Sequence, residues 1–316
     1  MTRYIEVVRM REEANKPPNA PLLKLRDSLQ GSISASLNAL LSTPIGSFLA
    51  SMPQPSSLFL SRLQELALAP PDASGDLMGV VDSMLREGRK YVRADQNGEA
   101  SGFLRNLNFS VSELLPQDQQ TEFNALVGIT YTASLTCTTC QSVKKTDPVE
   151  PYMFLQVPKN QEIDLEEAIC SMLKKRESGE VMNLECAKST CRPRGEKAQK
   201  RSHVSQLPKV LILVFNQEEK KQHQTKPMLD NKISVQGKTY QLSSIIHHTD
   251  DSKLATGNYY CDLVIPGPQS SWPWRCNQED RRGPREIENY QIGETYKLGH
   301  IYIFEEQHDN AEKEIR

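Results

Sequence analysis

Two pairs of cysteines have a spacing that could hold a metal ion. Cys137 and Cys140 form a Cys-x-x-Cys after one predicted strand, and Cys186 and Cys191 form a wider pair after another. Each short loop can turn two thiolates toward one ion, and four thiolates complete the tetrahedral set that zinc prefers. The spacing predicts a structural zinc site that bridges two hairpins of an extended element. Reduced thiols that bind no metal are the alternative.

A second group of reactive side chains lies where two predicted strands meet between residues 240 and 264. The first strand ends in His247 and His248, and the second begins at Tyr259 after a polar loop. Imidazole is the usual base in protein active sites. Successive residues of a strand point to opposite faces, so only one of the two histidines can face a given cleft.

Composition limits the kind of protein that carries these groups. The chain has 316 residues, a net charge of -2 and seven cysteines. It is long enough for one large domain or two small ones, and its charge gives no reason to expect nucleic acid as a partner. We find no apolar run of the roughly 18 residues that a membrane span requires, and the N-terminus is too charged for a secretory signal. We expect no membrane association and an intracellular protein of the cytoplasm or the nucleus, with reduced cysteines.

The predicted elements that position these groups change from helices to strands along the chain. Apolar spacing predicts helices first and alternating strands from residue 129 onward. The predicted helices are 34–52 with an interruption at Pro44, 57–68, 77–92 and one that begins at Asp164. The clearest predicted strands are 129–135, 151–158, 210–216 and 300–304. The polar stretch 93–120 is interpreted as connection more than core.

Several stretches, in order along the chain, resemble the sequence boxes of the ubiquitin-specific protease family. They are the segment 31–38, residues 72–82, the two cysteine pairs, the strand 207–213, the Gly-Asn-Tyr triplet 257–259, residues 274–277 and the strand 300–305. No single box is decisive, but their order and separations are hard to obtain by chance.

The resemblance implies a fold and a division into domains. It implies an α+β fold of the cysteine-protease type, with a helical N-terminal lobe as thumb, zinc-tipped fingers and an antiparallel β palm. The expected limits are an arm over 1–20, the ubiquitin-specific-protease-like domain over 21–308 and a charged tail over 309–316. Within the domain, the thumb is expected at about 21–125, the fingers at about 126–215 and the palm at about 216–308.

The catalytic positions that the resemblance assigns are occupied by the wrong residue types. The family mechanism needs a thiolate, an imidazole that carries its proton and a group that orients the imidazole. Ser34 stands at the cysteine position, or Ala35 does if the register shifts by one residue. Asn258 stands at the histidine position and Asn277 at the orienting position, and Ser32 replaces the asparagine that stabilises the oxyanion. No catalytic residue is expected to be intact.

The resemblance therefore implies a pseudo-deubiquitinase. We expect a domain that binds ubiquitin or a ubiquitin-like protein, or serves as a scaffold for other proteins, without being an enzyme. One alternative is an active deubiquitinase that uses another base, for which His247, His248 and His300 are the nearest choices. His300 is otherwise expected to be a strand cap or a surface residue. The other alternative is a zinc-stabilised interaction module that does not bind ubiquitin.

Overall fold

The computed structural model describes the following parts of the chain. The described residues are 29–55, 57–69, 79–80, 83, 100–156, 162–183, 197–216, 224–225, 231–248, 259–264, 273–276, 285–286 and 299–307. The helices are α2 (Leu29–Leu41), α3 (Pro44–Ser51), α4 (Leu58–Leu68), α6 (Ala100–Leu114), α7 (Gln117–Val127) and α8 (Leu165–Ser178).

The strands fall into two large sheets and one small pair. They are β1 (Ile129–Cys137), β2 (Val143–Thr146), β3 (Val149–Glu150), β4 (Met153–Gln156), β5 (Glu162–Ile163), β6 (Glu180–Asn183), β7 (Lys197–Gln206), β8 (Val210–Asn216), β9 (Gln224–Thr225), β10 (Lys232–Val235), β11 (Lys238–His248), β12 (Tyr259–Val264), β13 (Pro273–Cys276), β14 (Arg285–Glu286) and β15 (Gly299–Glu306).

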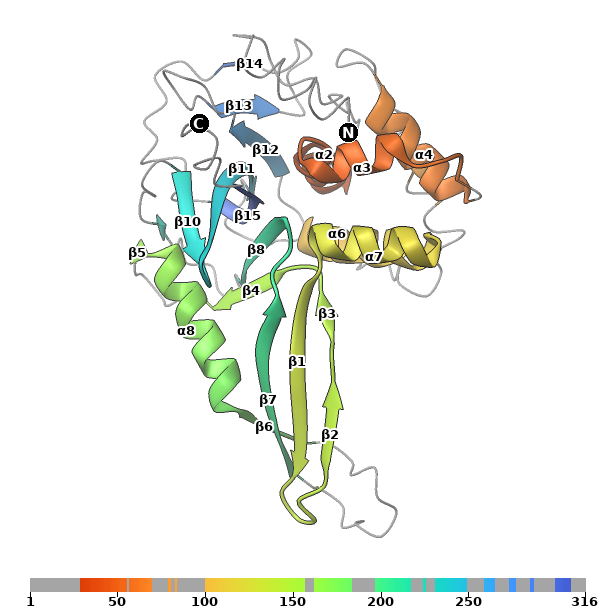
Figure 1. Cartoon of the computed structure of the whole chain (residues 1–316). Coiled ribbons are helices and arrows are strands. Elements are labelled where there is room, and N and C mark those ends of the chain that lie inside the picture. The colour runs from red at the N-terminus through yellow and green to blue at the C-terminus, as the bar shows by residue number, and fades with distance from the viewer. Residues whose placement is uncertain are drawn as a thin grey trace, which may run out of the picture.

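The elements form a helical lobe, a central sheet and a second sheet that extends away from them (Figure 1). The helices α2 to α7 make up the lobe that we call the thumb. Among the described residues, the palm sheet has eight strands in the order β14-β13-β12-β11-β15-β8-β4, with β10 paired to β11, and only its β4–β8 pair is parallel. The finger sheet has five strands in the order β2-β1-β7-β6, with β3 paired to β1. This arrangement confirms the predicted α+β class with thumb, palm and fingers.

Local sequence signals explain where the helices begin. Thr43 caps α3 by accepting a hydrogen bond from the Ile45 amide, and Pro44 follows at the first helical position, where its missing amide is harmless. The Asp164 side chain accepts a hydrogen bond of 3.1 Å from the Glu167 amide at the start of α8. The predicted interruption at Pro44 and the predicted cap at Asp164 are both confirmed.

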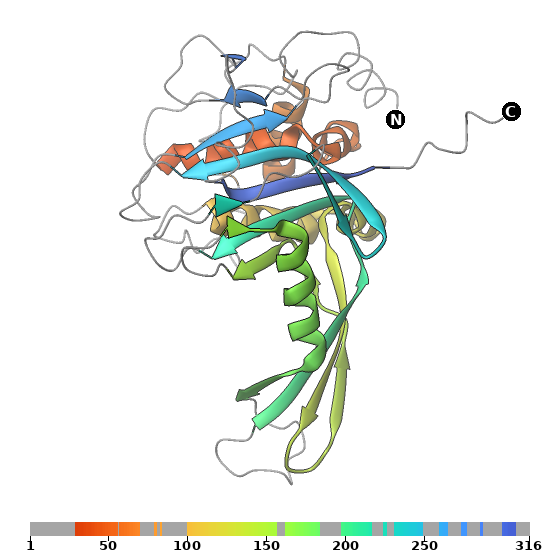
Figure 2. The same ribbon diagram turned by 90° about the vertical axis from the view of Figure 1, so that its left-hand side faces the viewer.

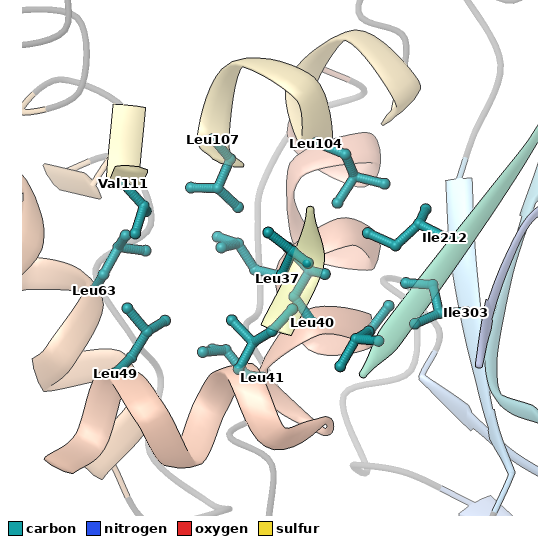
Figure 3. Close-up of a cluster of buried hydrophobic side chains, with 14 of the residues drawn as sticks. Leu37, Leu40, Leu41, Leu49, Leu63, Leu104, Leu107, Val111, Ile212 and Ile303 are labelled. Atoms are coloured by element: carbon teal, nitrogen blue, oxygen red, sulfur yellow. The ribbon is translucent and has the colours of Figure 1, made fainter. Parts of the chain in front are cut away.

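The main core lies between the thumb and one face of the palm sheet. Figure 3 shows leucines of α2, α3, α4 and α6 directed toward one another and toward Ile212 of β8 and Ile303 of β15. The side chains in this cluster include Leu37, Leu40, Leu41, Leu49, Leu63, Leu104, Leu107 and Val111. A second cluster lies on the other face of the palm and joins it to α8 through Leu165, Ile169 and Leu173. The palm sheet is therefore covered by side chains on both faces.

The prediction for residues 93–120 is wrong where the structure describes them. Residues 100–114 form α6, whose buried positions include Leu104, Leu107 and Val111. These residues repeat at helical spacing, but the asparagines and serines between them dilute the apolar content of the segment. Ser110 and Asn108 are themselves buried, so the segment is core despite its polar composition.

No described helix is long and apolar enough to cross a membrane by itself. Among the described residues, only the consecutive segments 32–41 and 44–51 together reach the length and apolarity of a membrane span, and they are bent by 82° at the break between them.

An ion pair between Arg176 and Glu150 joins α8 to the finger sheet. The Arg176 guanidinium donates hydrogen bonds to both carboxylate oxygens of Glu150, at 3.1 and 2.9 Å, and lies 4.5 Å from the ring centre of Tyr131. Burial raises the pKa of Tyr131 well above its ordinary value, while Arg176 lowers it and Glu150 raises it by smaller amounts, so the phenol stays neutral. A bidentate pair with a stacked ring fixes both partners in one geometry.

The replacement Arg176→Met is expected to lower the free energy of unfolding by about 1 to 2 kcal/mol, because it removes both the paired hydrogen bonds and the cation–π contact. Urea unfolding followed by circular dichroism measures the change. The control is Arg62→Met, which removes a more exposed pair with Glu65 on α4 and should change stability by less than about 0.5 kcal/mol. Equal effects of the two replacements would show that the Arg176–Glu150 pair contributes no more to stability than an exposed pair does.

Candidate functional site

Ser34 lies inside α2 and not at its first turn. Ser34 is 5% exposed, and its Oγ accepts a hydrogen bond of 3.4 Å from the side-chain amide of Asn38, one helical turn later. The helix begins at Leu29, so Ser34 comes after the first turn, where the helix dipole acts most strongly. Ala35, the other candidate for the cysteine position, is 2% exposed. Neither residue supplies a thiol, and the Ser34 hydroxyl gains little from the helix terminus.

The helix that carries Ser34 packs against β12 and β11 of the palm sheet. Tyr259 and Cys261 of β12 belong to the same buried cluster as Leu37 and Leu40 of α2. Residues alternate between the two faces of a strand, so the odd-numbered residues of β12 face α2 and Asp262 lies on the far face. The α2 side of the palm is therefore the side on which a base for Ser34 would have to lie.

His247 lies on the far face and is paired with a buried carboxylate. Its Nε2 is 3.1 Å from Asp262 Oδ2, and the two residues are 1% and 0% exposed. Imidazole and carboxylate are thus in close contact, although Nε2 forms no regular hydrogen bond. The imidazole also stacks on Tyr260 at 4.7 Å between ring centres and 14° between planes. His247 is thus on the wrong face of the sheet to serve Ser34.

His248 of β11 and His300 of β15 both lie near the ring of Tyr259 of β12. The His248 ring is 4.7 Å from the Tyr259 ring, and the His300 ring is 6.2 Å from it. Adjacent residues of β11 thus contact different partners, as strand alternation requires. The expectation of a cap or surface role for His300 is wrong, because this residue is 2% exposed. It lies where the register between β11 and β15 shifts, an irregularity that no local pattern of residues around His300 predicts.

The first cysteine pair lies in the turn between β1 and β2. Cys137 ends β1 and is 6% exposed, and Cys140 is half-buried with its Sγ 3.1 Å from Ser142 Oγ. The Cys137 amide donates to the Ser142 carbonyl at 3.0 Å, and the Gln141 amide donates to the Cys137 carbonyl at 3.0 Å. This tight turn holds the two thiol-bearing residues together at the end of the finger sheet.

Four of the predicted site residues fall outside the described part of the chain. They are Asn258, Asn277, Cys186 and Cys191. Within the described ranges, no three His, Cys, Asp or Glu side chains gather closely enough to hold a metal ion. The strand register still locates the ends of the segment that carries Cys186 and Cys191. Cys137 pairs with Ala198 of β7, and Ala198 pairs with Met182 of β6, so this segment leaves and returns beside Cys137.

The comparisons with known proteins agree with this arrangement. The family model described as ubiquitin carboxyl-terminal hydrolase matches residues 27–264, well over half of the chain. The chain belongs to the ubiquitin carboxyl-terminal hydrolase family. Among solved structures, the Neurospora crassa Pan2 catalytic unit, with protease and nuclease domains, matches 94% of this chain with a TM-score of 0.66 and 13% identity. This chain spans 58% of that chain, and the identity supports a shared fold alone. No curated protein matches.

Some buried polar residues of this ubiquitin carboxyl-terminal hydrolase domain were predicted from the family resemblance, and others were not. Ser34 and Ala35, the two residues that the resemblance proposed for the cysteine position, both lie on α2, which packs against the palm. The pair of His247 and Asp262 was missed by sequence reasoning. The available signal was an aspartate inside the apolar run Tyr259–Val264, because a charged residue in a buried strand usually has a partner.

Proposed function

We propose that this ubiquitin carboxyl-terminal hydrolase domain binds ubiquitin or a ubiquitin-like protein without hydrolysing it, and acts in the cytoplasm or the nucleus as a binder or scaffold. The observation that supports the proposal is the state of Ser34. The family position for the nucleophile holds a buried hydroxyl bound by Asn38, on the helix that packs against β12.

The sequence of the second family position supports the same proposal. Asn258 immediately precedes Tyr259, and a neutral amide does not accept a proton near neutral pH. A serine needs such a base more than a cysteine does, because its hydroxyl is far less acidic than a thiol. A contact surface for a protein partner is much larger than a catalytic triad, so the loss of chemistry leaves room for binding.

Titration of labelled ubiquitin with the domain, followed by fluorescence anisotropy, tests the binding half of the proposal. Saturable binding of ubiquitin, or of a related modifier such as SUMO in a parallel titration, is the expected result. An absence of binding to every modifier would favour the zinc-stabilised interaction module that recognises other proteins.

The proposal includes a structural zinc ion held by Cys137, Cys140, Cys186 and Cys191. Thiolates are the ligands that structural zinc prefers, and a tetrahedral site takes four of them. The support from the fold is the turn at Cys137 and the register that brings the ends of the second cysteine segment to the same tip. The ion would tie the two ends of the finger sheet together and would take no part in a reaction.

Metal analysis of the purified domain is expected to find about one zinc ion per chain. The replacement Cys137→Ser is expected to abolish zinc binding and to lower the melting temperature, because structural zinc sites contribute directly to folding. The matched control is Cys170→Ser, which changes an exposed thiol on α8 and should alter neither zinc content nor melting. Zinc-free protein whose stability is insensitive to Cys137→Ser would disprove the site.

A further inference from the structure

The two faces of the finger sheet have different environments. On one face, Ile129 and Tyr131 of β1 pack with Ile169 of α8 in the second hydrophobic cluster. Figure 2 shows α8 lying along that sheet. The alternate residues of β1, from Thr130 to Thr136, are half-buried, so they lie on the opposite face. We call that opposite face the open face.

Strand register identifies the other residues of the open face. Cross-strand partners share a face, and Thr136 is the partner of both Val143 on β2 and Gln199 on β7. Gln199 is in turn the partner of Val181 on β6. The two valines at the ends of this row are 56% and 64% exposed, which is unusual for large apolar side chains on a sheet.

The neighbouring rows of the open face are basic. Ser134 is the partner of Lys145 and of Arg201, and the next row pairs Thr132 with His203. Lys145, Arg201 and His203 are all exposed. In the part of the chain that the structure describes, none of the three forms an ion pair. Three basic side chains therefore lie together with hydroxyl groups between them.

One carboxylate of this sheet, that of Glu150, is turned to the covered face. Glu150 is the partner of Ile129, which packs against α8, and both of its oxygens are bound by Arg176. It therefore neutralises charge on the α8 side and not on the open face. The register of β1 with β2 and β3 is continuous and places Asp147 opposite Thr132, so the described open face carries three basic side chains and one carboxylate.

A glycine leaves space for the basic row at the edge of the sheet. Gly179, with φ of +98°, ends α8 just before β6. A Cβ added there would lie 2.9 Å from Gln199 Nε2 and 3.0 Å from Arg201 Cγ. The absence of a side chain at this position lets Gln199 and Arg201 lie along the sheet surface.

We propose that the open face, defined by Val143, Lys145, Val181, Arg201 and His203, is a docking surface for an acidic protein segment. Carboxylates would pair with the basic rows, and the flanking valines would take apolar side chains, as in interfaces that combine charge with a hydrophobic anchor. The described face has no Trp, Tyr or Phe on which nucleic acid bases would stack. The proposal goes beyond the binding of ubiquitin and does not depend on it.

The test is the binding of a fluorescein-labelled peptide rich in Asp and Glu, with Leu residues interspersed, to the whole domain at a fixed salt concentration. The double replacement Lys145→Glu with Arg201→Glu is expected to weaken binding about tenfold or more, because like charges then face each other. All the altered side chains are exposed, so the melting temperature should be unchanged.

The control is Lys144→Glu with Lys174→Glu, which gives the same net charge. Lys144 adjoins Lys145 but pairs with Leu135 on the covered face, and Lys174 is exposed on α8. This variant is expected to bind the peptide as the wild type does, within about twofold. Three results would overturn the proposal: no saturable binding of the peptide by the wild type, equal weakening in both variants, or tighter binding of a single-stranded oligonucleotide at the same salt concentration.

Discussion

The domain is expected to release a fluorescent leaving group from the C-terminus of ubiquitin no faster than buffer does, even with the domain in large excess. Hydrolysis by the family mechanism needs a thiolate and an imidazole, and the proposed function assigns Ser34 or Ala35 and Asn258 to those positions. The loss of one member of such a triad costs about four orders of magnitude in rate. The fluorescence time course measures the release, and Ser34→Ala is expected to leave it unchanged.

Further variants in this assay distinguish a domain that lacks only the catalytic residues from a domain that lacks the whole active site. The double replacement Ser34→Cys with Asn258→His is expected to release the leaving group faster than buffer. Its rate should stay well below that of active family members, because residue 34 comes after the first turn of α2. Release by the wild type that disappears in Ser34→Ala would contradict the inactive assignment. His248→Ala and His300→Ala would then identify the base, with His247→Ala as the control on the far face of the palm.

The replacement Asp262→Ala is expected to lower the free energy of unfolding by about 3 to 5 kcal/mol. Asp262 is 0% exposed and His247 is 1% exposed, so the loss of the carboxylate leaves a buried imidazole without the group that lies 3.1 Å from its Nε2. The stacked ring of Tyr260 closes one side of the pair and limits the room for rearrangement. Urea unfolding measures the change.

The double replacement His247→Leu with Asp262→Leu serves as the control for this pair. Two apolar side chains of similar volume leave no buried charge without a partner, and such exchanges are often neutral or stabilising. We therefore expect the double variant to be more stable than Asp262→Ala. A loss of less than about 1 kcal/mol in Asp262→Ala would show that the pair contributes no more than a surface contact does.

The sequence could predict the features of this fold that depend on neighbouring residues. The cap at Asp164 and the break at Pro44 were predictable because each involves bonds within one turn of the chain. The α2 position of Ser34 could be found from the family boxes, because they preserve order along the chain. Its hydrogen bond with Asn38 follows the spacing of one helical turn.

The features that could not be predicted depend on contacts between distant segments. The pairing of His247 with Asp262 requires the register of β11 against β12, and the burial of His300 depends on an irregular register with β15. The helix α6 was missed because its apolar residues are diluted by buried polar ones, whose burial comes from packing against α2 and α7. Tertiary contacts decided these outcomes, not local preference.

The most direct test of binding without hydrolysis follows both events in one sample. Ubiquitin that carries a C-terminal fluorescent leaving group and a second label on its body is mixed with excess domain. We predict that the anisotropy of the second label rises to a plateau as the complex forms, while the fluorescence of the leaving group stays at the buffer rate. A rise in leaving-group fluorescence would show that the domain is an active hydrolase, and an unchanged anisotropy would show that it does not bind ubiquitin.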